Sequence, residues 1–300
     1  MTAQLAVVTV TYSSGEHLTT FLRSLEKATS PTPPVIIADN GSTDGAPEAA
    51  EQEFDNVTLI HTGGNIGYGG GINRAVAALE KDIEFIAVAN PDVDWGPGSL
   101  DELLAAAQRW PRAGSLGPLI HEPDGAIYPS ARRVPDLTSG IGHALFSHVW
   151  KSNPWTRAYR ADDAAPSERP VGWLSGSCLL MRREAFEAVG GFDSRYFMYM
   201  EDVDLGDRLG KAGWLNVYVP DATIVHTKGH AAGRNPEKML PAHHRSAYQF
   251  QADRNPGPWR APLRLALRAG LAMRSRVAVY AARRTPDPAT ADTSEEGTSR

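Results

Sequence analysis

The first third of the chain alternates short runs of apolar and β-branched residues with longer segments of helical periodicity. A run of four to eight such residues bounded by turn formers indicates a buried strand, whereas apolar residues spaced three and four positions apart indicate a helix. Strands that alternate with helices are typical of a parallel sheet covered by helices. We therefore expect an α/β fold with a mostly parallel central sheet flanked by helices, with strands at 5–10, 35–39, 57–61 and 83–89 and helices at 16–28, 46–54, 71–79 and 99–109.

Polar clusters follow the expected strands at the points where the strands end. They are Thr11-Tyr12, Asp39-Asn40-Gly41 and Asn90-Pro91-Asp92. Pro91 has no amide hydrogen to give to a sheet ladder, so the strand before it must end there. Because ligands of open parallel sheets bind outside the carboxyl ends of the strands, the three clusters predict one site at this edge.

Length and composition exclude several classes of protein. The 300 residues include 42% hydrophobic and 22% charged residues, and the net charge of -5 gives no reason to expect a nucleic-acid partner. The single cysteine, Cys178, cannot form an internal disulfide, which is typical of a reducing cytosol. No signal-peptide pattern opens the chain, and no run of about 18 apolar residues occurs. We expect a cytoplasmic chain whose contact with a membrane is peripheral.

Two loops that follow strands have the composition of a nucleotide site. In the segment 39–45, short polar side chains lie on a flexible backbone, and the Asp39 carboxylate can accept a hydrogen bond from a pyrimidine N3–H. A plain turn that caps the next helix has the same composition and stays open as an alternative. The glycine-rich segment 63–71 precedes a helix, where backbone amides can approach a diphosphate. It contains neither the dinucleotide-binding fingerprint nor the P-loop, so a flexible turn is again the alternative.

Asp92 is the main candidate for a metal ligand. Mg²⁺ and Mn²⁺ prefer oxygen ligands, often one or two carboxylates completed by phosphate oxygens and water. An acidic turn after a strand is the alternative, and Asp94 fits that interpretation. His226, after an expected strand at 214–219, can add an imidazole to the same cation, although an isolated histidine is more often structural. His230 and the pair His243-His244 give weaker signals.

The segment 197–205 carries the sharpest chemical signal. Aromatic residues lead into three carboxylates within four positions, those of Glu201, Asp202 and Asp204, at the start of an expected helix. Capping and the helix dipole explain one or two of these acids, but not all three. A general base needs a carboxylate within hydrogen-bond reach of the acceptor hydroxyl, and an apolar surrounding raises its basicity. The pattern favours Asp202 as a catalytic base.

Taken in chain order, these motifs resemble glycosyltransferase family 2, the inverting enzymes with a GT-A fold, across residues 5–235. The segments that carry the resemblance are 9–12, 39–45, 63–73, 90–92, 172–205 and 226–233. It implies that Asp202, with Glu201 beside it, is the base. It also implies a nucleotide site and a divalent cation, Mg²⁺ or Mn²⁺. Asn90 stands where that family's D-x-D motif has its first acid, which weakens the case for metal dependence. The implied donor contacts are Thr9, Tyr12, Asp39, Asn65, Asn90 and Asp92, and the implied metal ligands are Asp92 and His226.

Three segments, at 90–93, 172–178 and 197–205, are similar to the rhamnosyltransferase branch of this family. The resemblance implies transfer of L-rhamnose from dTDP-rhamnose to GlcNAc-diphospho-polyprenol, in synthesis of the cell-wall linker that carries arabinogalactan. Another nucleotide sugar or a polysaccharide acceptor stays open. A sugar-1-phosphate nucleotidylyltransferase is disfavoured, because segment 9–15 has no basic residue, and a silent binding module does not need the three acids.

The C-terminal part has a different composition. We expect a GT-A domain over 1–235, with acceptor-binding structure from about residue 115, then a basic helical extension over 236–284 and a disordered tail over 285–300. Between 259 and 284 there are seven arginines and no acid. Such a helix suits a membrane surface at the inner face of the plasma membrane, and packing on the catalytic domain is the alternative. We expect one helical face to hold Leu263, Leu267, Gly270 or Leu271, and Met273, bordered by Arg260, Arg264, Arg268, Arg274 and Arg276.

Overall fold

The computed structural model describes residues 4–135, 166–227 and 236–282, and for 236–238 and 281–282 the backbone alone. The chain divides into two compact units, residues 1–228 and 229–300, which are described separately. The expected disordered tail, much of the expected acceptor region and His230 lie outside the described residues.

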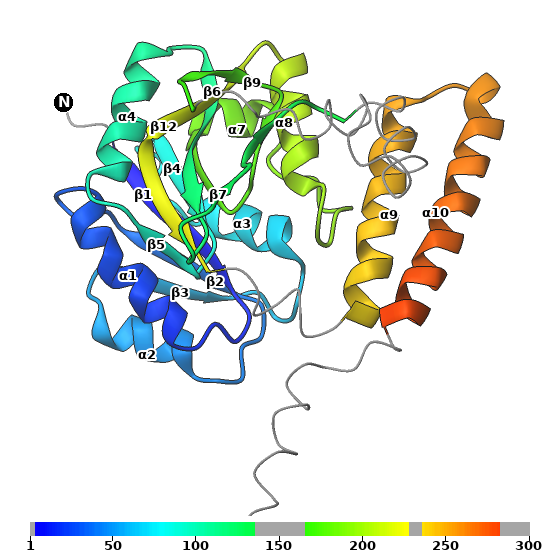
Figure 1. Ribbon diagram of the computed structural model, residues 1–300. Helices are drawn as coiled ribbons and strands as arrows, with labels where there is room; N and C mark the ends of the chain where they lie inside the picture. Colours follow the sequence, from blue (N-terminus) through cyan, green and yellow to red (C-terminus); the bar gives the residue numbers. More distant parts are fainter. Residues whose placement is uncertain (1–3, 136–165, 228–235, 283–300) are drawn as a thin grey trace, which may run out of the picture. The chain divides into compact units, whose positions relative to one another are not determined.

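The first half of the first unit is a parallel sheet whose strands are joined by helices (Figure 1). Its elements are β1 (Leu5–Thr11), α1 (Glu16–Ala28), β2 (Val35–Asp39), α2 (Ala46–Glu53), β3 (Val57–His61), α3 (Tyr68–Val76) and β4 (Phe85–Ala89). The strands lie in the order β3-β2-β1-β4. Every residue of β1, β2 and β4 is buried, because helices cover both faces of the sheet, and this explains their continuous apolar runs.

The second half of the first unit extends the same sheet with mixed strand directions. Its elements are β5 (Val93–Trp95), α4 (Ser99–Arg109), β6 (Ala113–His121), β7 (Ile127–Tyr128), β8 (Ala131–Arg132), β9 (Arg169–Val171), β10 (Trp173–Leu174), β11 (Cys178–Arg182), α7 (Arg183–Ala188), α8 (Glu201–Lys211) and β12 (Leu215–His226). Strand β11 is antiparallel to both β4 and β6, β12 is parallel to β6, and β5 is antiparallel to β12. Strands β8 and β10 form a separate small sheet.

Two apolar clusters pack on opposite faces of the sheet. One contains Phe21 of α1, Leu103 of α4 and Trp95, and the other contains Ile72 of α3, Phe186 of α7 and Leu209 of α8. The alternation within β1 follows this division, because Val7 belongs to the first cluster and Val8 to the second. The sheet is therefore the middle layer of three.

Two of the differences between the structure and the expected elements lie at the carboxyl-terminal part of the first unit. The strand expected over 214–219 continues as β12 through Pro220 to His226, because a shift of register between Val219 and Thr223 takes the proline out of the ladder. The helix expected near the three acids begins at Glu201, so that all three carboxylates lie in its first turn. Both differences bear on the site.

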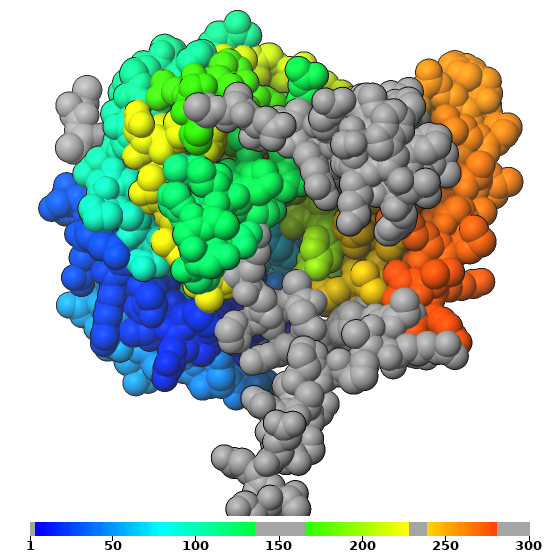
Figure 2. All heavy atoms as spheres, viewed as in Figure 1, coloured from blue at the N-terminus to red at the C-terminus, as the bar shows by residue number. Residues whose placement is uncertain are grey.

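The second unit holds two helices, α9 (Pro236–Arg254) and α10 (Ala261–Ala282), linked by the short helix η1 (Pro258–Arg260). The expected helix from 259 is thus confirmed, but its apolar face is divided. Leu267 and Leu271 are half-buried, whereas Leu263 and Met273 are exposed. Figure 2 shows α10 at the surface of its unit. Among the described residues, none of the helices combines the length and the apolar character needed to cross a membrane.

Candidate functional site

The carboxyl ends of β1 and β2 meet at Asp39. Its carboxylate is buried and accepts hydrogen bonds from the Thr11 hydroxyl at 2.9 Å, the Gly41 amide at 3.1 Å and both the amide and the hydroxyl of Ser42. Burial alone would favour the neutral acid, but these hydrogen bonds outweigh it and lower the pKa of Asp39. An ionised Asp39 therefore holds the loop that follows β2 in shape.

The glycine-rich loop is joined to that first loop. The Asn40 side chain donates to the carbonyl of Gly67 at 3.0 Å, and the Asn65 side chain accepts from the Gly67 amide at 3.0 Å. Gly67 has a φ of 82°, and a Cβ there would lie 2.3 Å from the carbonyl oxygen of Phe197. Only glycine fits, so this loop is pressed against the aromatic segment before α8.

Asp92 and His226 come together although 134 positions separate them, at the edge where β5 pairs with β12. His226 lies opposite Val93 in that ladder, and the Thr227 amide donates to the carbonyl of Asp92. The Nε2 atom of His226 is 3.1 Å from Oδ1 of Asp92 and 3.2 Å from the side-chain nitrogen of Asn90. The structure thus places three expected site residues in one cluster.

This cluster fits a divalent cation. Oδ1 of Asp92 is buried and has no hydrogen-bond partner within the described part of the chain, although it faces the imidazole. An oxygen and a nitrogen donor at this spacing suit neighbouring ligand positions, and Mg²⁺ takes few protein ligands when phosphates complete its shell. Groups of three or more His, Cys, Asp or Glu side chains able to hold a metal do not occur among the described residues.

Glu201 and Asp202 begin α8 at the same edge of the sheet. The Asp202 carboxylate accepts from the amides of Gly176, at 3.0 Å, and Val203, at 2.8 Å. Burial raises the pKa of the Glu201 carboxyl to about 8, and the charge of Asp202 adds to this rise. Burial also raises the pKa of Asp202, while its amide hydrogen bonds and the positive charge of Arg132 act against the rise. A carboxylate of raised pKa is suited to accept a proton.

A strained turn lies directly before Glu201 and Asp202. Tyr199 and Met200 both have positive φ, 66° and 68°, directly before Glu201. A left-handed backbone in a residue other than glycine costs on the order of 1–3 kcal/mol and is typical of functional sites. The turn fixes the first residues of α8, where the helix dipole also favours a negative charge at Asp202.

Tyr68 is a site residue that sequence reasoning missed. Its hydroxyl donates to the carbonyl of Gly176 at 2.6 Å, and the amide of the same Gly176 donates to Asp202. Burial raises the pKa of the Tyr68 hydroxyl well above its ordinary value, and the nearby charges of Glu201 and Asp202 raise it further. The hydroxyl therefore stays protonated and acts as a donor. A tyrosine beside several glycines gave no signal in the sequence.

Other expected site residues take different positions. Tyr12 is 55% exposed beside the loop that follows β2, whereas Thr9 is fully buried in β1 and its hydroxyl has no hydrogen-bond partner among the described residues. Asp94 pairs with Lys27 at 3.0 Å, as an acidic turn would. Asp204 pairs with Arg208 at 2.6 Å, which makes it a structural acid of α8.

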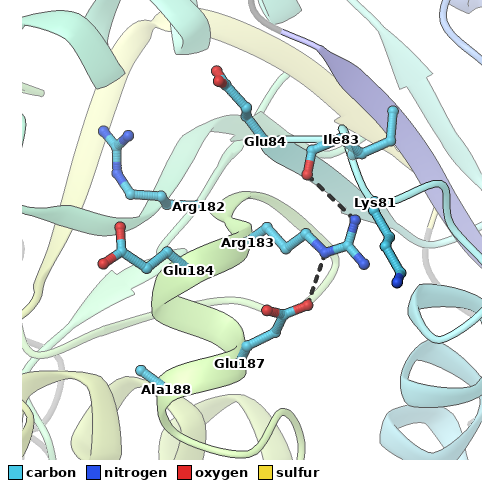
Figure 3. A pocket seen from close by; sticks show the side chains of 8 residues that line it. All are labelled: Lys81, Ile83, Glu84, Arg182, Arg183, Glu184, Glu187 and Ala188. Carbon is cyan, nitrogen blue, oxygen red and sulfur yellow. Dashed lines mark hydrogen bonds and ion pairs between the residues drawn. The ribbon is translucent and has the colours of Figure 1, made fainter.

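A groove of roughly 750 Å³ lies elsewhere on the first unit (Figure 3). Lys81, Glu84, Arg182, Arg183 and Glu187 line it. It lies at the amino end of β4, where Phe85 pairs with Arg182, whereas Ala89 at the other end of β4 pairs with Cys178 near the acid cluster. Arg183 is committed to Glu187 and to backbone carbonyls. We therefore expect the chemistry at Glu201 and Asp202 and not in this groove.

Comparison with known proteins gives a consistent family. Residues 6–190 match the model of glycosyl transferase family 2. The N-acetylglucosaminyl-diphospho-decaprenol L-rhamnosyltransferase of Mycobacterium tuberculosis is 60% identical over 288 residues, which cover 93% of this chain and 94% of that protein. The rhamnosyltransferase WbbL of Escherichia coli is 29% identical over 64% of this chain and 72% of its own length.

Solved structures agree on the fold. A mannosyltransferase from Pyrobaculum calidifontis, in complex with GDP-Man and Mn²⁺, superposes with a TM-score of 0.55 at 19% identity, over 96% of this chain and 77% of that one. GalNAc-T7 with UDP, GalNAc and Mn²⁺ superposes with a TM-score of 0.57 at 15% identity, over 76% and 44% of the two chains. The expected GT-A fold is confirmed.

Proposed function

The chain belongs to glycosyl transferase family 2, and we propose that it transfers L-rhamnose from dTDP-rhamnose to a hydroxyl of GlcNAc-diphospho-polyprenol. The observation that carries the proposal is the 60% identity, over nearly the full length of both chains, to a protein that bears this activity in its name. As the resemblance implies, the product would belong to the cell-wall linker that carries arabinogalactan.

The reaction is a single displacement with inversion, and Asp202 supplies the base. The acceptor hydroxyl gives its proton to the Asp202 carboxylate as its oxygen attacks the anomeric carbon. The new oxygen–carbon bond forms while the bond from that carbon to the donor diphosphate breaks, and the diphosphate leaves with the electron pair. The amide of Gly176 orients the carboxylate, because it donates to Oδ2. Glu201, whose pKa is raised to about 8, carries a proton at neutral pH and so limits the repulsion around Asp202.

Asp92 and His226 would hold a divalent cation, Mg²⁺ or Mn²⁺, beside the donor diphosphate. When bound, such a cation stabilises the negative charge of the leaving diphosphate. Asn90 lies beside the His226 ring, with its side-chain nitrogen 3.2 Å from Nε2. Support for the metal comes from the unpartnered oxygen of Asp92 in this cluster, within the described residues.

The two joined loops, which follow β2 and β3, would bind the nucleotide. Asp39 shapes the first loop and offers its remaining acceptor capacity to the base. Tyr12 is exposed beside that loop and offers a ring face for the base to contact. Asn65 fixes the shape of the glycine-rich loop through its bond to the Gly67 amide, and this loop would lie against the diphosphate.

The second unit would bring the enzyme to its lipid acceptor at the inner face of the plasma membrane. Exposed apolar side chains lie on α10 at Leu263, Leu265, Met273, Val277 and Tyr280, and the last three follow one another at spacings of four and three positions. Arg268, Arg274 and Arg276 are exposed on the same helix, and each basic residue near an anionic surface contributes roughly 1 kcal/mol of attraction. The proposal therefore extends to peripheral, salt-sensitive membrane binding by residues 236–284.

A donor screen tests the proposed function. Purified full-length protein is incubated with GlcNAc-diphospho-lipid and, in turn, dTDP-rhamnose, a UDP-sugar and a GDP-sugar, and release of the nucleoside diphosphate is measured. We expect acceptor-dependent release of dTDP and a rhamnosylated lipid. Release with another donor alone would replace the proposed donor within the same family, and sugar transfer to a polysaccharide alone would replace the acceptor.

A further inference from the structure

We propose that Arg132 binds the diphosphate group of the acceptor and so forms an anion subsite beside Asp202. The inference rests on the proposed function, because it takes a phosphorylated acceptor as given. It assigns the subsite to a residue that no sequence motif singled out.

The backbone places Arg132 next to the segment that holds the base. Strand β8 pairs with β10, so that Arg132 lies opposite Trp173, and the Gly172 amide donates to the Arg132 carbonyl at 2.9 Å. Three residues beyond Trp173 comes Gly176, whose amide holds Asp202. The charge of Arg132 reaches this carboxylate, since it lowers the pKa of Asp202 against the effect of burial.

The side chain of Arg132 is held in place by groups that leave most of its donors unused. Its guanidinium lies 5.6 Å from the ring centre of Tyr128 and 5.7 Å from that of Trp173, and its Nε donates to the carbonyl of Pro129 at 2.7 Å. A guanidinium has five N–H donors. Its four terminal ones have no partner in residues 4–135, 166–227 and 236–282.

Three other arginines of this unit are paired with acids. Arg109 pairs with Glu168, Arg183 with Glu187 and Arg208 with Asp204. Within the described residues, Arg132 differs from these three, because aromatic rings contact its guanidinium and no carboxylate is bonded to it. A cation beside a general base also lowers the basicity of that base, which works against catalysis. A second anion in the site removes this conflict.

The chemistry of the proposed acceptor supplies that anion. A guanidinium fork matches two phosphate oxygens, and stacking on aromatic rings presents it in a fixed orientation. The donor diphosphate is assigned to Asp92 and His226, so the anion for Arg132 is the diphosphate that joins GlcNAc to its lipid. Only the sugar ring separates that diphosphate from the sugar hydroxyls. An arginine that binds the diphosphate can therefore lie close enough to Asp202 to lower its pKa, as Arg132 does.

The test compares two acceptors that share the same sugar. One is a short-chain GlcNAc-diphospho-lipid, and the other is a neutral alkyl GlcNAc glycoside. For Arg132→Gln we expect kcat/KM with the diphosphate acceptor to fall about 10- to 100-fold, the loss expected for hydrogen bonds to a charged group, and kcat/KM with the neutral acceptor to stay within about twofold. Arg132→Lys should lose less than Arg132→Gln, because it keeps the charge without the fork. Arg23→Gln removes the same charge at the exposed pair with Glu53 and is the matched control.

Equilibrium binding of the diphosphate acceptor in the presence of dTDP gives a second readout, with Kd expected to rise about 10-fold or more in Arg132→Gln. An unchanged Kd, or an equal loss of kcat/KM on both acceptors, overturns the subsite. Binding of dTDP-rhamnose to the variant should be unchanged. Absence of rhamnose transfer by the unmodified protein to either acceptor would contradict the proposed function instead, and the binding measurement would still test Arg132.

Discussion

Replacing Tyr68 by phenylalanine removes one oxygen atom and tests how the base is held. The hydroxyl donates to the Gly176 carbonyl at 2.6 Å, and the amide of Gly176 donates to Asp202 at 3.0 Å. There is little slack around Gly176, since a Cβ there would lie 3.2 Å from Cβ of Asp202 and 3.6 Å from the Tyr68 ring. The variant keeps the ring and its edge-to-face contact with Phe192, so it removes the hydrogen bond while leaving the packing in place.

The magnitude follows from the two hydrogen bonds. Loss of the hydroxyl leaves the Gly176 carbonyl without this donor, which should lower the free energy of unfolding by about 1–2 kcal/mol. The freed peptide then holds Asp202 less well. A hydrogen bond to a charged group contributes about 1.5–3 kcal/mol and one pKa unit corresponds to about 1.4 kcal/mol, so partial loss of the Gly176 bond should raise the pKa of Asp202 by about 0.5–1 unit.

The sign of the pH effect separates this role from a purely structural one. A base works in its ionised form, so activity falls as the pH drops through its pKa. In Tyr68→Phe the acid limb of the kcat/KM profile should therefore move upward by about 0.5–1 pH unit, with kcat lowered and the KM for the donor little changed. Tyr218→Phe, eight positions before His226 along β12, is the control. An unmoved acid limb together with wild-type kcat would refute this role for Tyr68.

Three further predictions concern the metal, the acid pair and the second unit. Excess chelator should abolish transfer, and full activity in chelator would remove the cation from the mechanism. Asp92→Ala should weaken the binding of dTDP-rhamnose in the presence of metal, which titration calorimetry measures. Because the pKa of Glu201 is raised to about 8 in the fold, its stabilising effect is complete below its ordinary value of 4.5 and is lost as the pH rises through about 8. Glu201→Gln should therefore gain at least about 1 kcal/mol in free energy of unfolding relative to wild type between pH 5 and pH 9, measured by urea denaturation, and parallel curves would contradict the raised pKa. Neutralising Arg268, Arg274 and Arg276 together should weaken binding to anionic liposomes by about 100-fold at low salt, and truncation after Gly257 should weaken it as well. If both variants sediment with liposomes as the unmodified protein does, α10 is merely structural.

The sequence was most informative where local pattern and burial coincide. The bounds of β2 and β3 agree with the expected strands, because both are short apolar runs ended by polar residues. Asp202 also stood out, since three acids at the start of one helix exceed what capping requires. Residue patterns suggested a shared cation for Asp92 and His226 but favoured a structural histidine, because the contact between the two depends on a ladder between β5 and β12. It was the resemblance that grouped them.

Other features depend on contacts that leave no mark in local sequence. Tyr199 and Met200 have a left-handed backbone, which tyrosine and methionine rarely adopt, so the sequence carries no turn signal at this place. Tyr68 and Gly176 are 108 positions apart and meet only in the folded chain. On α10, helical periodicity gave the positions of Leu263 and Leu267 but could not tell which of them is the more exposed.

The most direct test of the central claim is the turnover of Asp202→Asn with dTDP-rhamnose and GlcNAc-diphospho-lipid. The amide is close in size to the carboxylate but cannot accept the proton, so kcat should fall by at least about 100-fold while the Kd for dTDP-rhamnose stays within about threefold. Turnover close to that of the unmodified protein would contradict the assignment of Asp202 as the base.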